Sequence, residues 1–349
     1  MFRREFGFPS KGKAGRGGFV DIAIAAENLG KRYGNHQALA GVDLEVRSGT
    51  VLGLLGHNGA GKTTTIRMLA TLLEPDSGSA RVAGFDVVRE QREVRRRIGL
   101  AGQYAAVDEL LTGRENLVLL GTLLRLGRRR ARQRAEELLT AFELTGAADR
   151  PVRTYSGGMR RRLDLAACLI ASPTVLFLDE PTTGLDPASR MVLWKMVREQ
   201  VAQGVTMLLT TQYLEEADFL ADRIMVFAAG RTLAEGTPDE LKQKVGGEWL
   251  EVAVATAEDL PAALSALGPV AGASPTVDET SHRISVQLAD RMGSIAAAAA
   301  ALEGCGADVV DFALRRPSLD DVFFHLTGES KPDPNKSGEN PTTTAEDGS

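Results

Sequence analysis

The sequence has few cysteines and no long apolar run, and each shortage removes a class of protein. Its 349 residues include two cysteines, Cys168 and Cys305, which lie far apart. Two distant thiols provide neither a disulfide framework nor the ligand spacing of a zinc site. This cysteine usage excludes small disulfide-stabilised secreted proteins and is typical of a reducing compartment.

The apolar runs are too short for membrane insertion. None approaches the roughly 18 residues that a membrane-spanning helix requires. The nearest candidate, residues 165–178, contains Ser172 and Pro173 and is followed directly by two acidic residues. The N-terminal residues Met1 to Glu5 lack the apolar core of a signal peptide. We therefore expect a soluble chain that is located in the cytoplasm.

Positive charge is not in excess. The chain carries 41 Lys and Arg against 46 Asp and Glu, a formal net charge of −5, which argues against a dedicated nucleic-acid binder. Residues 1–18 form a Gly-rich basic arm and residues 329–349 a polar tail, and both are expected to be disordered. The arm and the arginine cluster at 125–134 are compatible with a solvated surface or with contact to anionic lipid or a partner.

The most informative stretch is a G-x-x-x-x-G-K-T pattern. It comprises Gly56, His57, Asn58, Gly59, Ala60, Gly61, Lys62 and Thr63, and Thr64 follows it. Residues 51–55 before it are typical of a buried strand, and the apolar residues at 66–73 have helical spacing. A strand, a glycine-rich turn and a helix direct several backbone N–H groups at one phosphate. Lys62 is expected at the β- and γ-phosphates and Thr63 on Mg²⁺, so the stretch predicts a nucleotide-binding protein.

A second apolar run ends on two adjacent carboxylates. Residues 175–178 are typical of a buried strand, and Asp179 and Glu180 follow it. An aspartate at that point is placed to hold Mg²⁺ opposite Thr63, directly or through water. The glutamate after it is placed to accept a proton from an attacking water, which is the task of a hydrolase rather than a kinase.

Strands and helices alternate through most of the chain, which predicts an α/β fold with a mostly parallel sheet covered by helices. We expect a nucleotide-binding domain over residues 19–246, with a helical subdomain at about 104–163. After it the pattern indicates a small α+β domain over residues 247–328, for which a ferredoxin-like order is one option.

Cap residues mark the starts of three predicted helices. Ser156 is a good N-cap, and Asp186 followed by Pro187 is typical of a helix start. Ser318 and Asp321 have the spacing of a capping box for a last short helix.

Further motifs give the chain a resemblance to a known family. They are Gln103, the turn Ser156-Gly157-Gly158-Met159-Arg160, and the run from Leu178 through Asp179, Glu180 and Pro181 to Asp186. With the phosphate loop, this combination resembles the ATP-binding subunit of an ABC transporter over about residues 20–245. The resemblance implies ATP and Mg²⁺ as cofactors, a homodimer, an integral-membrane permease, no nucleic-acid partner, and a peripheral location on the cytoplasmic face of the cell membrane.

The resemblance also implies a role for each matching residue. Tyr33 would stack on adenine, although a tyrosine there is equally compatible with a core position. Gln103 would contact Mg²⁺ or the attacking water and relay to the membrane partner. Asp186 would communicate across the dimer interface. The signature residues would contact the γ-phosphate of ATP bound to a second copy, and they are Ser156, Gly157 and Gly158.

One position departs from the family pattern. Where the family usually has histidine, this chain has Gln212, within Thr210-Thr211-Gln212-Tyr213. Glutamine can hydrogen-bond the γ-phosphate but cannot carry charge, so hydrolysis is expected to be slow. Three features resemble the daunorubicin-resistance branch of the family, whose members are ATP-binding subunits of antibiotic exporters. They are this motif around Gln212, His57-Asn58 in the loop, and the ending from Pro317 to Phe323.

Two other functions are alternatives to export. A soluble ABC ATPase that remodels ribosomes or DNA is expected to carry two cassettes or a long coiled coil, and neither is seen. A nucleotide-binding regulator without turnover is suggested by Gln212, and phosphate release that depends on Glu180 would exclude it. The sequence favours an ATPase that powers drug or antibiotic efflux, with Glu180, Gln212 and Lys62 as its catalytic residues.

Overall fold

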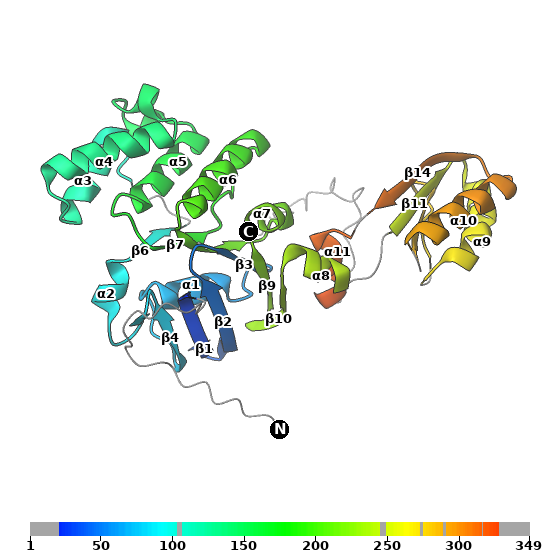
Figure 1. The fold of residues 1–349 in the computed structure, drawn as a ribbon, viewed down its shortest axis with the longest axis horizontal. Helices are drawn as coiled ribbons and strands as arrows, with labels where there is room; N and C mark the ends of the chain where they lie inside the picture. The colour runs from blue at the N-terminus through cyan, green and yellow to red at the C-terminus, as the bar shows by residue number, and fades with distance from the viewer. Residues whose placement is uncertain are drawn as a thin grey trace, which may run out of the picture.

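The computed structural model describes residues 21–102, 107–244, 249–272, 275–288, 291–315 and 317–327. The predicted basic arm, the predicted polar tail and Gln103 lie outside these residues. Figure 1 shows a larger N-terminal region (residues 21–244) and a smaller C-terminal region (residues 249–315) that projects from it. In the part of the chain that is described, every helix is too short or too polar to cross a bilayer.

The N-terminal region is built on a six-stranded sheet with the order β10-β9-β3-β8-β7-β6. Its strands are β3 (Val51–Leu55), β6 (Ile98–Ala101), β7 (Val175–Asp179), β8 (Thr206–Thr211), β9 (Arg223–Ala228) and β10 (Arg231–Gly236). All neighbouring strands pair in parallel except β9 and β10. Every residue of β3, β7 and β8 is buried, as expected for a parallel sheet covered on both faces. The predicted α/β class is confirmed.

A second, antiparallel sheet lies beside the first. It has the order β2-β1-β4-β5 and consists of β1 (Ile22–Tyr33), β2 (His36–Arg47), β4 (Ser77–Val82) and β5 (Phe85–Asp86). Ala23 and Ile24 of the long strand β1 share a hydrophobic core with residues of helix α1 (Lys62–Leu69) and of strand β3. This core holds the strand before the phosphate loop and the helix after it in fixed positions.

The remaining helices of the N-terminal region surround the parallel sheet. They are α2 (Gln91–Arg95), α3 (Gly113–Leu123), α4 (Arg128–Ala141), α5 (Gly157–Cys168), α6 (Pro187–Ala202), α7 (Leu214–Leu220) and α8 (Pro238–Lys244). Helices α3, α4 and α5 gather at one end of the molecule (Figure 1). Helices α3 and α4 fall within the residue range given for the expected helical subdomain. Short 3₁₀ turns at Thr145–Ala147 and Val152–Thr154 precede α5. The five arginines from Arg125 to Arg132 are exposed, and Arg134 pairs with Glu137 at 3.0 Å.

The predicted caps are present. The hydroxyl of Ser156 accepts a hydrogen bond from the backbone N–H of Met159 at 3.2 Å, and Asp186 accepts one from the N–H of Ser189 at 2.9 Å. Each cap satisfies an amide that the first turn of a helix leaves without a partner. The local sequence therefore fixes where α5 and α6 begin.

The C-terminal region is a four-stranded antiparallel sheet covered by two helices. Its elements are β11 (Trp249–Val254), a 3₁₀ turn (Ala257–Asp259), α9 (Leu260–Leu267), a second 3₁₀ turn (Gly268–Val270), β12 (Thr276–Asp278), β13 (Arg283–Gln287), α10 (Arg291–Gly304) and β14 (Val309–Arg315). The strand order is β12-β13-β11-β14, which is the ferredoxin-like arrangement that the sequence left as one option. Its core includes the alternating residues Leu250, Val252 and Val254.

The last helix, α11 (Leu319–Thr327), packs away from this small core. Its residues Leu319, Val322 and Phe323 share a hydrophobic cluster with α7, α8 and β9 of the N-terminal region. The chain thus leaves the N-terminal region after α8, forms the small sheet, and returns to the N-terminal region through α11 (Figure 1). The expected boundaries at 246 and 328 stay a prediction.

Candidate nucleotide-binding site

The phosphate loop has a shape that only glycine fits at several points. It connects β3 to α1, and Gly59 and Gly61 have φ of 83° and 107°, in the left-handed region. A Cβ on Gly56 would lie 2.5 Å from the carbonyl oxygen of Phe227. The glycines therefore let the backbone close around an anion at the N-terminus of α1.

Lys62 lies buried at the mouth of this loop. Its ammonium donates hydrogen bonds to the carbonyl oxygens of Gly56 at 2.5 Å and His57 at 3.0 Å. It also lies 3.9 Å from Glu180 Oε1. Burial lowers the pKa of Lys62, and the nearby carboxylates of Glu180 and Asp179 oppose that shift. A phosphate entering the loop would meet this cation directly.

Thr63 and Asp179 form the oxygen pair expected of a magnesium site. Thr63 Oγ1 donates to Asp179 Oδ1 at 3.1 Å, and Thr210 Oγ1 donates to the same oxygen at 2.6 Å. Hydroxyl and carboxylate oxygens suit Mg²⁺, which keeps waters and phosphate oxygens for its other ligands. The described residues contain no cluster of three His, Cys, Asp or Glu side chains that would hold a metal without a nucleotide. The donor set fits a magnesium ion that arrives with ATP.

Glu180 is held in a strained backbone conformation beside Lys62. Its φ is 50°, a left-handed value that is uncommon for a residue other than glycine. Its N–H lies 3.1 Å from both the carbonyl oxygen and the hydroxyl of Thr210, and Thr183 Oγ1 donates to its Oε2 at 3.4 Å. The carboxylate is therefore fixed at the carboxyl end of β7, facing the phosphate loop.

Arg161, which no sequence motif indicated, joins three parts of this site. Its guanidinium donates to the carbonyl oxygens of Pro181 at 2.6 Å, Gly102 at 2.7 Å and Glu180 at 3.3 Å. These bonds connect α5 to the segment after Glu180 and to the residue just before Gln103. The only sequence signal for Arg161 is its position in the helix that Ser156 caps. Its three acceptors are backbone carbonyl groups, which leave no pattern of residue types.

Gln212 follows β8 at the same sheet edge and is partly buried. Strands β7 and β8 pair with Asp179 opposite Thr210, so the residues that follow both strands lie at the same edge. The next residue, Tyr213, carries the guanidinium of Arg190 at 4.3 Å from its ring centroid. Gln212 therefore lies on the same edge as the acidic pair.

A buried glutamate, Glu216, was also missed. Its Oε1 accepts hydrogen bonds from Thr182 Oγ1 at 2.8 Å and from Trp194 Nε1 at 3.0 Å. Burial raises the pKa of Glu216, and hydrogen bonds from Thr211, Thr182 and Trp194 oppose that shift. This carboxyl group connects the segment after Glu180 to the segment that carries Gln212.

The signature turn and Asp186 lie on a separate exposed surface. Ser156, Gly157 and Asp186 are exposed. The hydroxyl of Ser189 donates to Asp186 at 2.6 Å, and a Cβ on Gly158 would lie 2.8 Å from that hydroxyl. The turn and Asp186 thus lie close together, with Ser189 between them.

The other predicted nucleotide contacts are Tyr33 and three residues in or next to the loop. Tyr33 ends β1, and 45% of its surface is exposed. This exposure favours a platform for a base over the alternative core position. Asn58 is exposed in the loop, Ala60 is buried, and Thr64 is partly buried on α1.

Comparisons with known proteins agree with this site. Residues 39–183 match the family model described as ABC transporter, and residues 236–327 match the model described as ATP-binding protein DrrA1-3-like, C-terminal domain. The chain belongs to the ABC transporter family, as one of its ATP-binding subunits. It is 58% identical over 306 residues to the daunorubicin resistance ATP-binding protein DrrA2 of Streptomyces coeruleorubidus, which covers 88% of this chain and 95% of that protein.

Solved structures resemble the same domain. An ATP-binding subunit of an ABC transporter has a TM-score of 0.58 and 28% identity, covering 64% of this chain and 92% of that chain. A dimeric ATP-binding cassette in a post-hydrolysis state, bound to ADP and Pi, has a TM-score of 0.56 and 25% identity, covering 61% of this chain and 98% of that chain. The predicted fold and ATPase activity are confirmed, and nothing supports the non-transport alternative.

Proposed function

We propose that this chain hydrolyses ATP to power the efflux of a drug or antibiotic-like compound through a separate integral-membrane permease. The similar DrrA2 protein is named for daunorubicin resistance, and the similarity extends over the C-terminal region as well as the ATPase domain. The chain would then bind peripherally to the cytoplasmic face of the cell membrane, where the permease holds it.

The residues around the phosphate loop suit ATP with magnesium. Backbone N–H groups of the loop and the ammonium of Lys62 would bind the β- and γ-phosphates. Thr63 and Asp179 would hold Mg²⁺, which when bound supplies positive charge to the phosphate oxygens. Tyr33 would stack on the adenine ring, and Gln103 would act between the nucleotide and the permease.

Hydrolysis would be carried out by Glu180 with Gln212. The oxygen of a water attacks the γ-phosphorus while the bond to the β–γ bridging oxygen breaks. Glu180 accepts the proton that the water loses, and its buried, hydrogen-bonded carboxylate is positioned for this. The amide of Gln212 donates a hydrogen bond to the γ-phosphate and positions the reacting groups without taking up a proton.

A second copy of the chain would complete each site. The exposed N-terminus of α5, with Ser156, Gly157 and Gly158, offers unpaired N–H groups to the γ-phosphate bound by its partner. Asp186, linked to the same turn through Ser189, would carry information between the two sites. The post-hydrolysis dimer among the similar structures supports this arrangement.

The observation that carries the proposal is the placement of Glu180 beside Lys62, 3.9 Å away, at the mouth of the phosphate loop. The test uses inside-out membrane vesicles that contain the chain and its integral-membrane permease. We expect ATP-dependent accumulation of daunorubicin, and we expect Glu180→Gln to abolish it. Vesicles that hydrolyse ATP through Glu180 but accumulate no daunorubicin or other amphipathic drug would refute the proposed export.

A further inference from the structure

The last helix of the chain contacts the phosphate loop. The rings of Phe323 in α11 and His57 in the loop have centroids 4.6 Å apart and an interplanar angle of 89°. Edge-to-face pairs of this kind are favourable beyond their buried area. Phe323 is 4% exposed, so its ring is fixed, whereas His57 is exposed on the loop. A residue near the end of the sequence therefore packs against a residue of the nucleotide site.

The surrounding packing holds Phe323 firmly against the base of the loop. Its cluster includes Leu55, the last residue of β3 and the direct neighbour of Gly56. The other buried members are Ala217, Ala221, Ile224, Val226, Leu241, Leu319 and Val322. Helix α11 thus packs against α7, α8 and the strand that leads into the phosphate loop. It therefore contacts the point at which the loop begins.

The backbone of His57 in turn contacts Lys62. Its carbonyl oxygen accepts a hydrogen bond from Lys62 Nζ at 3.0 Å and one from the N–H of Ala60 at 3.2 Å. A loop residue that moves its carbonyl group moves both of these contacts. An edge contact on the His57 side chain therefore favours the loop conformation in which Lys62 makes this hydrogen bond.

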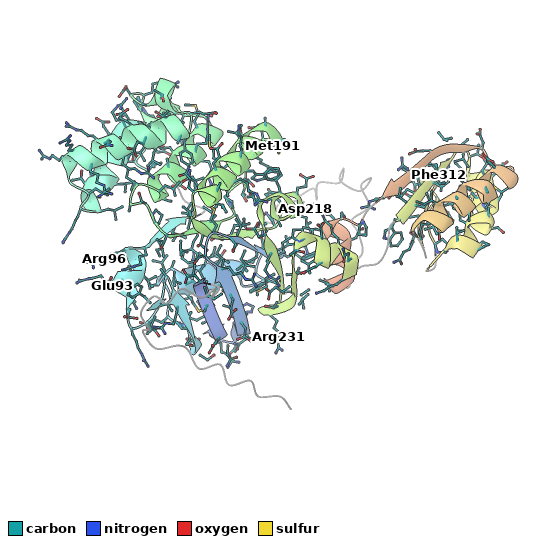
Figure 2. The ribbon with its side chains drawn as sticks, in the orientation of Figure 1. Glu93, Arg96, Met191, Asp218, Arg231 and Phe312 are labelled. Atoms are coloured by element: carbon teal, nitrogen blue, oxygen red, sulfur yellow. The ribbon has the colours of Figure 1, made fainter. Side chains whose placement is uncertain are left out.

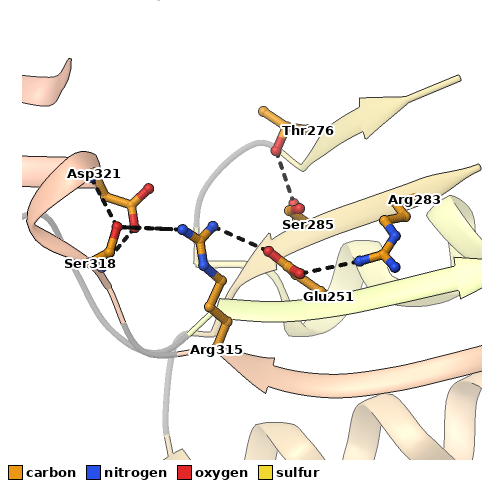
Figure 3. Close-up of polar contacts among 7 residues, drawn as sticks. All are labelled: Glu251, Thr276, Arg283, Ser285, Arg315, Ser318 and Asp321. Carbon is orange, nitrogen blue, oxygen red and sulfur yellow. Dashed lines mark hydrogen bonds and ion pairs between the residues drawn. The ribbon is translucent and has the colours of Figure 1, made fainter. Parts of the chain in front are cut away.

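The N-terminus of α11 is joined by ion pairs to the small sheet. Arg315, at the end of β14, lies 3.2 Å from Glu251 of β11 and 3.3 Å from Asp321 of α11. Asp321 also accepts a hydrogen bond from the N–H of Ser318 at 2.8 Å, which closes the predicted capping box. Figure 3 shows this connected set of side chains between the sheet and the helix. Arg315 therefore joins the small sheet to the N-terminus of α11.

We infer that Phe323 is a positioning residue for ATP binding: through His57 it stabilises the receptive form of the phosphate loop, and so the C-terminal region adjusts the affinity for ATP. The inference rests on the ATP site and is independent of the exported compound. Loss of one aromatic pair corresponds to about a 3- to 10-fold change in an equilibrium constant. The expected effect falls on KM and on the dissociation constant for ATP, while kcat changes by less than about twofold because Glu180 is not moved.

The test compares Phe323→Leu with Val322→Ala in the full-length protein. Phe323→Leu keeps an apolar side chain of similar volume and removes the ring. Val322 is 1% exposed in the same cluster and has no ring to offer His57, so Val322→Ala is a control for lost packing. We expect Phe323→Leu to raise the KM for ATP about 3- to 10-fold and Phe323→Tyr, which keeps the ring, to retain the wild-type KM. Val322→Ala should lower Tm without changing KM. Equal KM values for the Phe323→Leu and Val322→Ala variants would overturn the inference.

A second measurement reads the contact itself. The chain has four histidines, so the imidazole protons of His57 can be assigned in a selectively labelled sample by comparison with His57→Ala. We expect the ring of Phe323 to shift these protons and Phe323→Leu to remove the shift. In a double-mutant cycle on ATP affinity, His57→Ala and Phe323→Leu together should cost no more than the larger single effect. Fully additive effects, or an unchanged His57 spectrum, would refute the coupling.

Discussion

Thr63 and Asp179 are 116 residues apart in sequence, and the Thr63 hydroxyl donates a hydrogen bond to the Asp179 carboxylate at 3.1 Å. The strand order explains this, because β8 lies between β3 and β7 and all three run in parallel. The carboxyl ends of parallel strands meet at one edge of the sheet, where ligands of α/β proteins bind. The phosphate loop and the acidic pair are therefore brought together by the sheet itself.

Lys62→Ala is expected to weaken ATP binding by about 100-fold, the effect of losing charged hydrogen bonds to a phosphate. The change also removes the cation nearest to the carboxylate of Glu180. The unbalanced negative charge of this carboxylate then repels the triphosphate. Titration with a fluorescent ATP analogue measures the loss. Lys195→Ala, on the exposed side of α6, serves as the control and should bind normally. Unchanged affinity in the Lys62 variant would show that the loop has been misassigned.

Glu180→Gln is expected to lower the rate of ATP hydrolysis by about 10²- to 10⁴-fold while ATP still binds. The amide keeps the size of the side chain but cannot accept the proton from the attacking water. Steady-state phosphate release, together with an ATP-binding titration, separates the two effects. A variant that turns over at the wild-type rate would remove Glu180 from its role as the base.

Gln212→His is expected to leave ATPase activity intact or to raise it. Histidine keeps a donor for the γ-phosphate, and its unperturbed pKa of about 6.5 adds a group that can carry charge near neutral pH. The pH profile of the variant should therefore change between about pH 6 and pH 7, while the wild-type profile lacks that step. Complete loss of activity would mean that the glutamine amide makes a contact that imidazole cannot replace.

Glu216→Gln is expected to change how stability depends on pH. Burial raises the pKa of Glu216 above the ordinary glutamate value of 4.5. The folded state then holds this proton more tightly than the unfolded state, so the contribution of Glu216 to stability falls as pH rises from 4.5 through the raised pKa. The variant lacks this decline, and its Tm relative to wild type should increase over that interval. A constant difference in Tm would show that Glu216 titrates alike in both states.

The sequence predicted those parts of the fold that depend on local signals. The caps at Ser156 and Asp186, the buried strand before Asp179 and the alternation in β11 each leave a pattern within a few residues. Helix ends leave a weaker signal, as at α4, whose first turn begins at Arg128 within the arginine cluster. The charged side chains of that turn are exposed and carry no hydrophobic signal.

Long-range packing accounts for what the sequence could not predict. The antiparallel sheet that contains β1 and β4 depends on pairing between distant segments, such as Ile24 with Val82. The three backbone acceptors of Arg161 and the contact between Phe323 and His57 follow from the tertiary fold alone. Figure 2 shows that the labelled side chains, among them Glu93, Arg96 and Phe312, are spread over both regions of the molecule. The nucleotide site, in contrast, lies at the carboxyl ends of β3, β7 and β8.

The central claim is that two copies of this chain close on ATP, each adding its Ser156 turn to the nucleotide of the other. The most direct measurement is the mass of the Glu180→Gln variant by light scattering, with and without ATP and Mg²⁺. We predict a change from one chain to two when ATP is added, and no change in a variant that also carries Ser156→Arg but still binds ATP. A Glu180→Gln variant that stays monomeric at saturating ATP, alone and with its permease, would contradict the account.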